Sequence, residues 1–130
     1  MDFSKHYIEM CRKAEELQAL WDPQPGDFYL DSEDDEIYTL CAARHCTFSL
    51  GYANTDIWLP RQDQLQRIWM KENEGGKDMW QAFYDFLTKK QSYIEDQLGW
   101  YSPEILWLAF VMYEKYQKVW NERTKQWEDI

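Results

Sequence analysis

The chain has 130 residues, a length at which one hydrophobic core usually accounts for the whole fold, so we expect a single globular domain over residues 1–130. Hydrophobic residues make up 45% of the sequence and aromatic residues 18%, which excludes an intrinsically disordered chain. The formal net charge of −10 argues against binding along the phosphates of a nucleic acid, because that mode requires clustered cations.

An amphipathic helix is predicted at the start of the chain. Ser4 is suited to cap it, and apolar residues then recur at the three-and-four spacing of one helical face as far as Trp21. The helix must end before Gly26, since Pro23 and Pro25 lack backbone donors and disfavour helical geometry in the residues that precede them.

Short strands are predicted next. Residues 28–30 and 37–41 are rich in aromatic and β-branched side chains, and the acidic segment 31–36 between them has the length of a hairpin loop. Residues 57–59 form a further predicted strand. Segment 42–55 fits a strand and a helical turn equally well, so the sequence assigns it neither.

Three helices are predicted in the second half of the chain. Pro60 suits the first position of one helix, and Asp78 with Gln81 resembles a capping box that opens another, which ends at Gly99. Ser102 is the expected cap of the third. The residues expected to face inward from the first two helices are Leu65, Ile68, Trp69, Trp80, Phe83, Leu87 and Ile94.

The third of these helices is predicted over residues 103–120. It is apolar on every side from 105 to 113, which indicates that it lies at the centre of the core. Beyond Trp120 the chain turns polar, with Trp127 as an isolated apolar contact. The order of these elements predicts an α+β fold, in which a small antiparallel sheet of about two or three short strands packs against about four helices.

Neither an exported nor a membrane-spanning segment is predicted. Residues 1–11 carry charges and lack the apolar core of a signal peptide, and the longest uncharged apolar stretch is about half of a bilayer span. The three cysteines form no CxxC pair and their number is odd, which suits a reducing cytosol. We therefore expect a cytoplasmic protein that binds no membrane.

The densest charge cluster is the segment 31–36, and we interpret it as a solvated hairpin loop. Its spacing lacks the central glycine and the distal glutamate of a calcium-binding loop. A cluster of this kind can dock to a basic patch on another protein and raise the rate of association. The predicted partner-binding residues of this loop are Asp31, Glu33, Asp34, Asp35 and Glu36.

A second candidate site lies where the strand at 57–59 leads directly into a helix. Arg61, Gln62 and Asp63 are expected in the first helical turn, where polar side chains recognise a ligand beside free helix amides or close the helix end. Capping is the simpler interpretation, because polar groups in a first turn commonly serve as caps.

Signatures of chemistry are weak. Cys41, His45 and Cys46 suggest zinc, but a closed site needs four ligands, normally with gaps of two to four residues, and the remaining candidates, His6 and Cys11, lie on the predicted first helix. Neither histidine belongs to a known nucleophile–base signature, and Gly75–Gly76 lacks the lysine and hydroxyl residue of a phosphate-binding loop. The sequence therefore predicts no catalytic residue, no metal and no cofactor.

The eight tryptophans divide into two groups. Trp21, Trp69, Trp80 and Trp107 lie at the spacing of helix core positions. The others have no such explanation, and two or more of them exposed together would indicate a protein interface. These others are Trp58, Trp100, Trp120 and Trp127.

Several blocks of the sequence carry a family resemblance. The two longest are residues 57–66 (IWLPRQDQLQ) and 106–116 (LWLAFVMYEKY), and the shorter ones are Val119-Trp120-Asn121, residues 7–11 and residues 26–29. Together these blocks resemble a group of small phage and prophage proteins of Gram-positive bacteria. Proteins of that group have no assigned activity, so the resemblance implies an origin and no particular chemistry. The acidic loop and segment 42–55 lie outside it.

The leading hypothesis is a phage-encoded accessory protein of the bacterial cytosol that binds a protein partner without catalysis. In its sharper form it inhibits a host or defence protein by occupying a basic surface. One alternative is a carboxylate-dependent, metal-assisted hydrolase with a divalent ion at the loop 31–36. Another is a structural homo-oligomer or a virion-associated protein.

Overall fold

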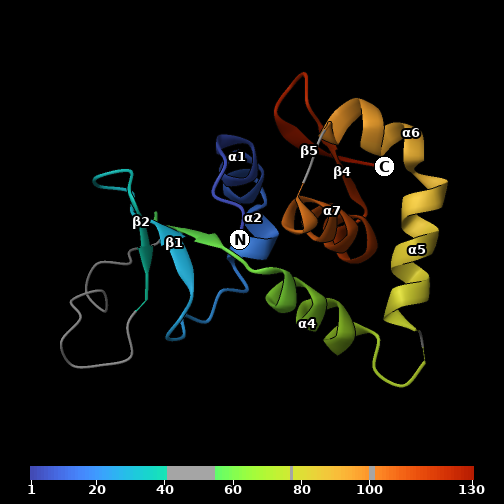
Figure 1. Cartoon of the computed structure of the whole chain (residues 1–130), viewed down its shortest axis with the longest axis horizontal. Coiled ribbons are helices and arrows are strands. Elements are labelled where there is room, and N and C mark those ends of the chain that lie inside the picture. The colour runs from blue at the N-terminus through green and yellow to red at the C-terminus, as the bar shows by residue number, and fades with distance from the viewer. Residues whose placement is uncertain (41–54, 77, 100–101) are drawn as a thin grey trace. The chain divides into compact units, whose positions relative to one another are not determined.

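The computed structural model of the chain describes residues 1–40, 55–76, 78–99 and 102–130 (Figure 1). Internal contacts divide the chain into two compact units. The N-terminal unit comprises residues 3–61, and the C-terminal unit comprises residues 62–130 together with Met1 and Asp2. The fold class is α+β, as the sequence predicts, and the single domain over the whole chain stays a prediction.

The N-terminal unit begins with two short helices, α1 (Lys5–Lys13) and α2 (Glu15–Gln18). Ser4 caps α1 as expected, because its Oγ accepts a hydrogen bond from the backbone N–H of Tyr7 at 3.1 Å. The continuous helix expected as far as Trp21 is wrong: the chain leaves helical geometry at Ala14 (φ −85°, ψ 68°). This break separates α1 from α2, and α2 ends at Gln18.

The sheet of this unit contains β1 (Phe28–Leu30), β2 (Ile37–Thr39) and β3 (Ile57–Leu59), in the antiparallel order β2-β1-β3. Tyr29 at the centre lies opposite Tyr38 on one side and Trp58 on the other. The predicted strands are therefore confirmed, except that β2 ends at Thr39. Segment 42–55, which the sequence left unassigned, lies mostly outside the described residues.

Gln18 explains why the helical break matters. Its side-chain Oε1 accepts a hydrogen bond from Trp58 N at 2.8 Å, and its Nε2 donates to Trp58 O at 2.9 Å and to Cys11 O at 3.0 Å. One side-chain amide thus takes the place of a neighbouring strand at the outer edge of β3. Helix α1 also packs on β3, and the hydroxyl of its Tyr7 donates to Pro60 O at 2.6 Å.

The C-terminal unit consists largely of helices: α4 (Gln62–Glu72), α5 (Met79–Lys89), α6 (Gln91–Tyr93), a π-helical turn η1 (Ile94–Leu98) and α7 (Pro103–Tyr116). The expectation that Pro60 begins α4 is wrong, since the helix starts at Gln62. Asp78 caps α5 as predicted, accepting from Trp80 N at 2.9 Å. Among the described residues, no hydrogen bond from Asp78 N to Gln81 Oε1 completes the capping box, and Gln81 Nε2 donates to Asp85 Oδ1 at 2.9 Å.

Trp80 corrects the predicted inward face of α5. Its side chain is 59% exposed, whereas Phe86 is 4% exposed. Phe83 stacks on Trp107 of α7 with ring centroids 3.9 Å apart, and Trp80 meets the same indole only edge-on at 5.6 Å. The rotation of α5 is therefore set by the stacking of Phe83 and Phe86 against α7, which leaves Trp80 at the rim.

Helix α7 is the most buried element of this unit, as its apolar sequence predicts. Ser102 caps it by accepting from Ile105 N at 3.2 Å, and α4 lies along it in Figure 1. Trp69 of α4 stacks on Phe110 with centroids 5.9 Å apart. The buried residues of α7 are Glu104, Ile105, Trp107, Leu108, Ala109, Phe110, Val111 and Met112.

The end of the chain forms a hairpin that the sequence did not predict. Helix α7 ends at Tyr116, where Gln117 adopts a left-handed conformation (φ 52°), so its predicted extension to residue 120 is wrong. Strands β4 (Lys118–Asn121) and β5 (Gln126–Asp129) pair antiparallel and place Trp120 opposite Trp127, with their ring centroids 5.3 Å apart. Contact between these two rings across the strand pair stabilises the hairpin in a segment whose sequence is mostly polar.

Candidate functional site

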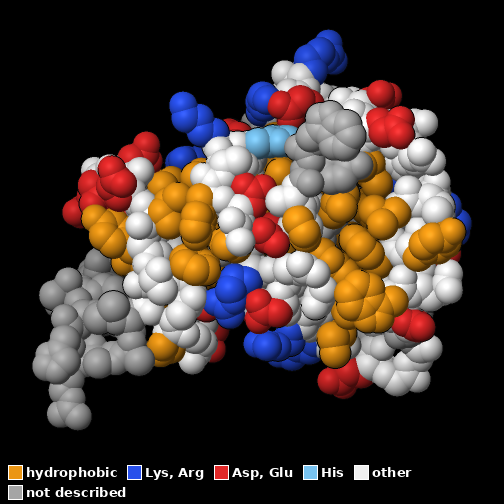
Figure 2. Space-filling view, viewed as in Figure 1, with side chains coloured by type: hydrophobic (Ala, Val, Ile, Leu, Met, Phe, Trp, Pro, Cys, Tyr) orange, Lys and Arg blue, Asp and Glu red, His pale blue; other side chains and the backbone are white. Residues whose placement is uncertain are grey.

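The acidic segment is the hairpin loop that the sequence predicts, and it joins β1 to β2. Asp31 N donates to Glu36 O at 2.9 Å, and Asp35 N donates to Asp31 O at 2.9 Å, which closes the loop. Two carboxylates also bind backbone N–H groups: Asp31 Oδ1 accepts from Glu33 N at 2.7 Å, and Asp34 Oδ1 accepts from Glu36 N at 2.9 Å. Figure 2 shows acidic side chains gathered at this hairpin tip.

The carboxylates of Glu33, Asp35 and Glu36 differ from those that build the loop. All three residues are exposed, and none of these carboxylates has a hydrogen-bond or ion-pair partner in the part of the chain that the structure describes. Asp35 itself is held in the left-handed region (φ 62°), a conformation that non-glycine residues seldom adopt. The loop therefore presents three carboxylates that have no hydrogen-bond or ion-pair partner among the described residues, on a backbone that forms its own hydrogen bonds.

Asp34 and Tyr38 form a hydrogen-bonded pair at the base of the loop, in which the Tyr38 hydroxyl donates to Asp34 Oδ2. This bond raises the pKa of Tyr38 to about 12 and lowers the pKa of Asp34 below its ordinary value. Both shifts favour the state with a neutral phenol and an ionised carboxylate.

We expect Tyr38 to titrate well above the ordinary tyrosine pKa of 10.0, because ionising the phenol breaks its bond to Asp34. The stabilisation linked to Tyr38 is complete below pH 10, the ordinary value, and is lost as the pH rises through about 12. Tyrosinate absorbance and ring NMR shifts measure this titration. In Asp34→Asn the titration of Tyr38 should move back toward 10, and an unchanged titration would contradict the assignment.

Asp56, which immediately precedes β3, lies beside the loop and is 6% exposed. Its Oδ1 accepts hydrogen bonds from Ser32 N at 2.9 Å and from Ser32 Oγ at 3.1 Å, whereas its buried Oδ2 has no hydrogen-bond partner. Burial, followed by Asp31, Asp56 and Asp34, raises the pKa of Tyr29. The negative charges of these three carboxylates therefore act on the Tyr29 hydroxyl in addition to its burial.

Sequence reasoning identified two members of this group, Asp31 and Asp34, and missed Asp56 and Tyr29. The available signal for Asp56 was its position directly before a predicted strand. That signal is weak, because strand order was unknown and only pairing of β1 with β3 brings Asp56 to Asp31.

The predicted junction site is not confirmed as a unit. Arg61 precedes α4, and its side chain reaches the turn at residues 25–26, where its Nη1 donates to Gly26 O at 2.9 Å and lies 3.6 Å from Asp27 Oδ1. Gln62 and Asp63 do lie in the first turn of α4, and Asp63 Oδ2 is 3.8 Å from Arg67 Nη2. Arg61 thus stabilises the turn around a buried carboxylate.

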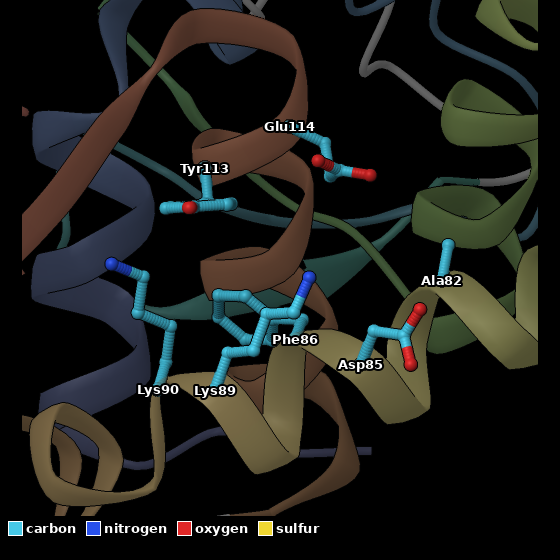
Figure 3. A pocket seen from close by; sticks show the side chains of 7 residues that line it. All are labelled: Ala82, Asp85, Phe86, Lys89, Lys90, Tyr113 and Glu114. Carbon is cyan, nitrogen blue, oxygen red and sulfur yellow. The ribbon is translucent and has the colours of Figure 1, made fainter.

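Hollows lie within each of the two units. A groove of about 490 Å³ in the N-terminal unit separates α1 from the hairpin, with Ile8, Leu30 and Ile37 among its lining residues. A smaller hollow of about 190 Å³ lies in the C-terminal unit, where Figure 3 shows side chains of α5 and α7 around it. Lys90 Nζ lies 5.0 Å from the centroid of the Tyr113 ring there. The residues lining the smaller hollow are Ala82, Asp85, Phe86, Lys89, Lys90, Tyr113 and Glu114.

The residues that line these two hollows include no serine, cysteine, threonine or histidine. Among residues 1–40, 55–76, 78–99 and 102–130, no three histidine, cysteine or acidic side chains are close enough to hold a metal ion. The zinc candidates Cys41, His45 and Cys46 lie outside these ranges.

The tryptophans also fall differently from the prediction. Trp58, Trp120 and Trp127 are 5%, 1% and 8% exposed, so these three form no surface patch, and Trp100 lies outside the described residues. Among the described tryptophans, the exposed one is Trp80, which lies beside the exposed Tyr84 on α5. Within the described residues, no helix is long and apolar enough to cross a membrane.

Comparison of the chain with protein families, with curated proteins and with solved structures found no match. The class that the structure defines is therefore an α+β protein with a rigid acidic hairpin.

Proposed function

We propose that the chain is a non-enzymatic acidic module that binds a protein partner through the β1–β2 hairpin. The observation that supports this proposal is the set of three exposed carboxylates without partners, those of Glu33, Asp35 and Glu36. Because hydrogen bonds already fix the loop backbone, little conformational entropy is lost when a partner binds it.

The partner of this hairpin carries a basic surface. A net charge of −10 attracts such a surface over several ångströms and accelerates encounter, while the fixed loop provides the local contact. The resemblance to phage and prophage proteins supports a host or defence protein as the partner, met in the bacterial cytosol. Binding of this kind inhibits the partner if the basic surface is the one with which it works.

Affinity purification from a Gram-positive host lysate, read by quantitative mass spectrometry, tests the proposal. The test variant is Glu33→Gln/Asp35→Asn/Glu36→Gln. Its matched control is Glu74→Gln/Asp96→Asn/Asp129→Asn, which removes three exposed carboxylates of the C-terminal unit that also lack partners.

We expect wild type and control to capture the same basic proteins, and the hairpin variant to lose them. Capture should weaken as salt rises, because exposed charges are screened over about 10 Å at 0.1 M salt. Equal capture by all three proteins, or no specific capture by wild type at low salt, would overturn the proposal.

A further inference from the structure

We propose that the face of the N-terminal sheet bearing Tyr29, Tyr38 and Asp56 binds the guanidinium group of an arginine side chain. This inference rests on the proposed function, since it assigns the arginine to the basic surface of the protein partner. The proposed site lies beside the exposed loop carboxylates, with Asp56 Oδ2 as its hydrogen-bond acceptor and the Tyr38 ring as its aromatic surface.

The unsatisfied oxygen of Asp56 is the first observation. Ser32 supplies two hydrogen bonds to Oδ1, but the buried Oδ2 receives none. A buried charged acceptor without a donor is costly, and native proteins hold very few of them. Asp56 is held by a residue distant in sequence, because its hydrogen bonds come from Ser32 in the β1–β2 loop. An incoming donor would therefore complete a carboxylate that the free protein leaves half satisfied.

The neighbouring charge is the second observation. The register pairs Leu30 with Ile57, so Asp31, which follows β1, and Asp56, which precedes β3, lie at the same end of this strand pair. Like charges directly opposite one another destabilise a sheet, and a cation bound between them reverses the sign of that interaction. The raised pKa of Tyr29, caused by burial and then by Asp31, Asp56 and Asp34, agrees with a gathering of negative charge here.

The aromatic rings are the third observation. Tyr38, Tyr29 and Trp58 lie opposite one another across the three strands and so share one face of the sheet. The Tyr29 and Tyr38 rings stack with centroids 5.9 Å apart, and Tyr38 is 42% exposed. Its hydroxyl bond to Asp34 orients the exposed ring. A planar cation can stack on that ring while its edge reaches the carboxylates.

The chemistry of the site favours a guanidinium over a metal ion or an ammonium group. In the described part of the chain no three acidic side chains converge closely enough for a metal ion. A guanidinium carries five donors in one plane, pairs with a carboxylate through two bonds and stacks on an aromatic ring. An ammonium group is compact and strongly hydrated, so it stacks less well on the aromatic ring and bridges the carboxylates less well than a guanidinium does.

Access to Asp56 requires a small movement at the surface. Ser32 Oγ lies 2.8 Å from Thr55 Oγ1 and 3.1 Å from Asp56 Oδ1, and both hydroxyl residues are exposed. Rotation of these two short side chains is the step by which the guanidinium reaches the buried carboxylate. The backbone bond from Ser32 N to Asp56 Oδ1 can remain throughout.

The probe for this site is the capped tripeptide acetyl-Gly-Arg-Gly-amide, titrated into the isotope-labelled full chain and followed by NMR. The expected result is a saturable shift of the Ser32 amide and of the Tyr29 and Tyr38 ring signals. The lysine tripeptide of the same length should bind several-fold more weakly. Shifts that do not saturate, or equal binding of the two peptides, would overturn the inference.

The decisive variant is Asp56→Asn, which keeps an oxygen for Ser32 and removes the negative charge. We expect it to bind the arginine peptide about tenfold more weakly, with a melting temperature equal to or above that of wild type. The matched control is Asp22→Asn, an exposed acid of the same unit, which should bind as wild type does. A lower melting temperature with unchanged peptide binding would show that Asp56 is purely structural.

These outcomes separate the inference from the proposed function. If Asp56→Asn captures the same host proteins as wild type while the hairpin variant captures none, the arginine site is refuted and the acidic module stands. If the arginine peptide binds at Asp56 but wild type captures no host protein, the site stands and its assignment to a partner surface is refuted.

Discussion

Replacing Phe110 by alanine should lower the free energy of unfolding by about 3–5 kcal/mol, the range expected for truncating a fully buried aromatic side chain. Phe110 has no exposed surface, and its ring lies within 6 Å of four others. The change leaves a cavity where α4, α5 and α7 meet, and rigid neighbouring rings cannot collapse to fill it. Those neighbours are Trp69, Phe83, Phe86 and Trp107.

Urea denaturation followed by tryptophan fluorescence measures this loss. Trp80→Ala is the matched control, because Trp80 also contacts Trp107 but is 59% exposed. Its cost should be about 1 kcal/mol or less, within the range of a single aromatic contact. A loss below about 2 kcal/mol for Phe110→Ala would show that this ring cluster does not form the core of the C-terminal unit.

Replacing Asp27 by alanine should destabilise the chain by about 3–5 kcal/mol, because it removes the acceptor from a buried polar network. Asp27 is 2% exposed and its Oδ2 accepts from Trp21 Nε1 at 3.0 Å and Gln24 N at 2.9 Å. Arg61 lies 3.6 Å from the other oxygen. Without the carboxylate, the two N–H donors and the guanidinium lose their partner together.

The control for this substitution is Asp22→Ala, an exposed acid in the same turn region, which should change stability by no more than about 0.5 kcal/mol. Asp27→Asn should fall between the two, since it keeps an oxygen acceptor and removes the charge. Thermal unfolding at constant ionic strength compares the three variants. Equal melting temperatures for Asp27→Ala and Asp22→Ala would refute a structural role of the Asp27 network.

For the acidic loop, the local sequence predicts the structure of the segment but not the role of each acidic side chain. A run of acids between two β-rich segments correctly predicts an exposed hairpin, because solvated charges and short strands are both local properties. Whether a given acid builds the loop or faces a partner is not local. Asp34 is held by Tyr38, whereas Asp35 and Glu36 have no such partner among the described residues.

The amino-acid sequence alone determined the fold class, the strands at 28–30 and 57–59, and the caps Ser4, Asp78 and Ser102. Each of these features depends on contacts within a few residues, such as a cap side chain that binds an N–H in the first turn. Strand propensity is likewise carried by the side chains of the strand itself.

Only the tertiary structure decided the features that depend on distant residues. The break at Ala14 accompanies the bonds from Gln18 to Trp58, forty positions along the chain. Strand β4 forms against β5, and Trp80 is exposed because other residues of α5 stack on α7. Asp56 reaches Ser32 across paired strands. In each case the free energy comes from a partner that the local pattern cannot specify, so pattern alone could not predict it.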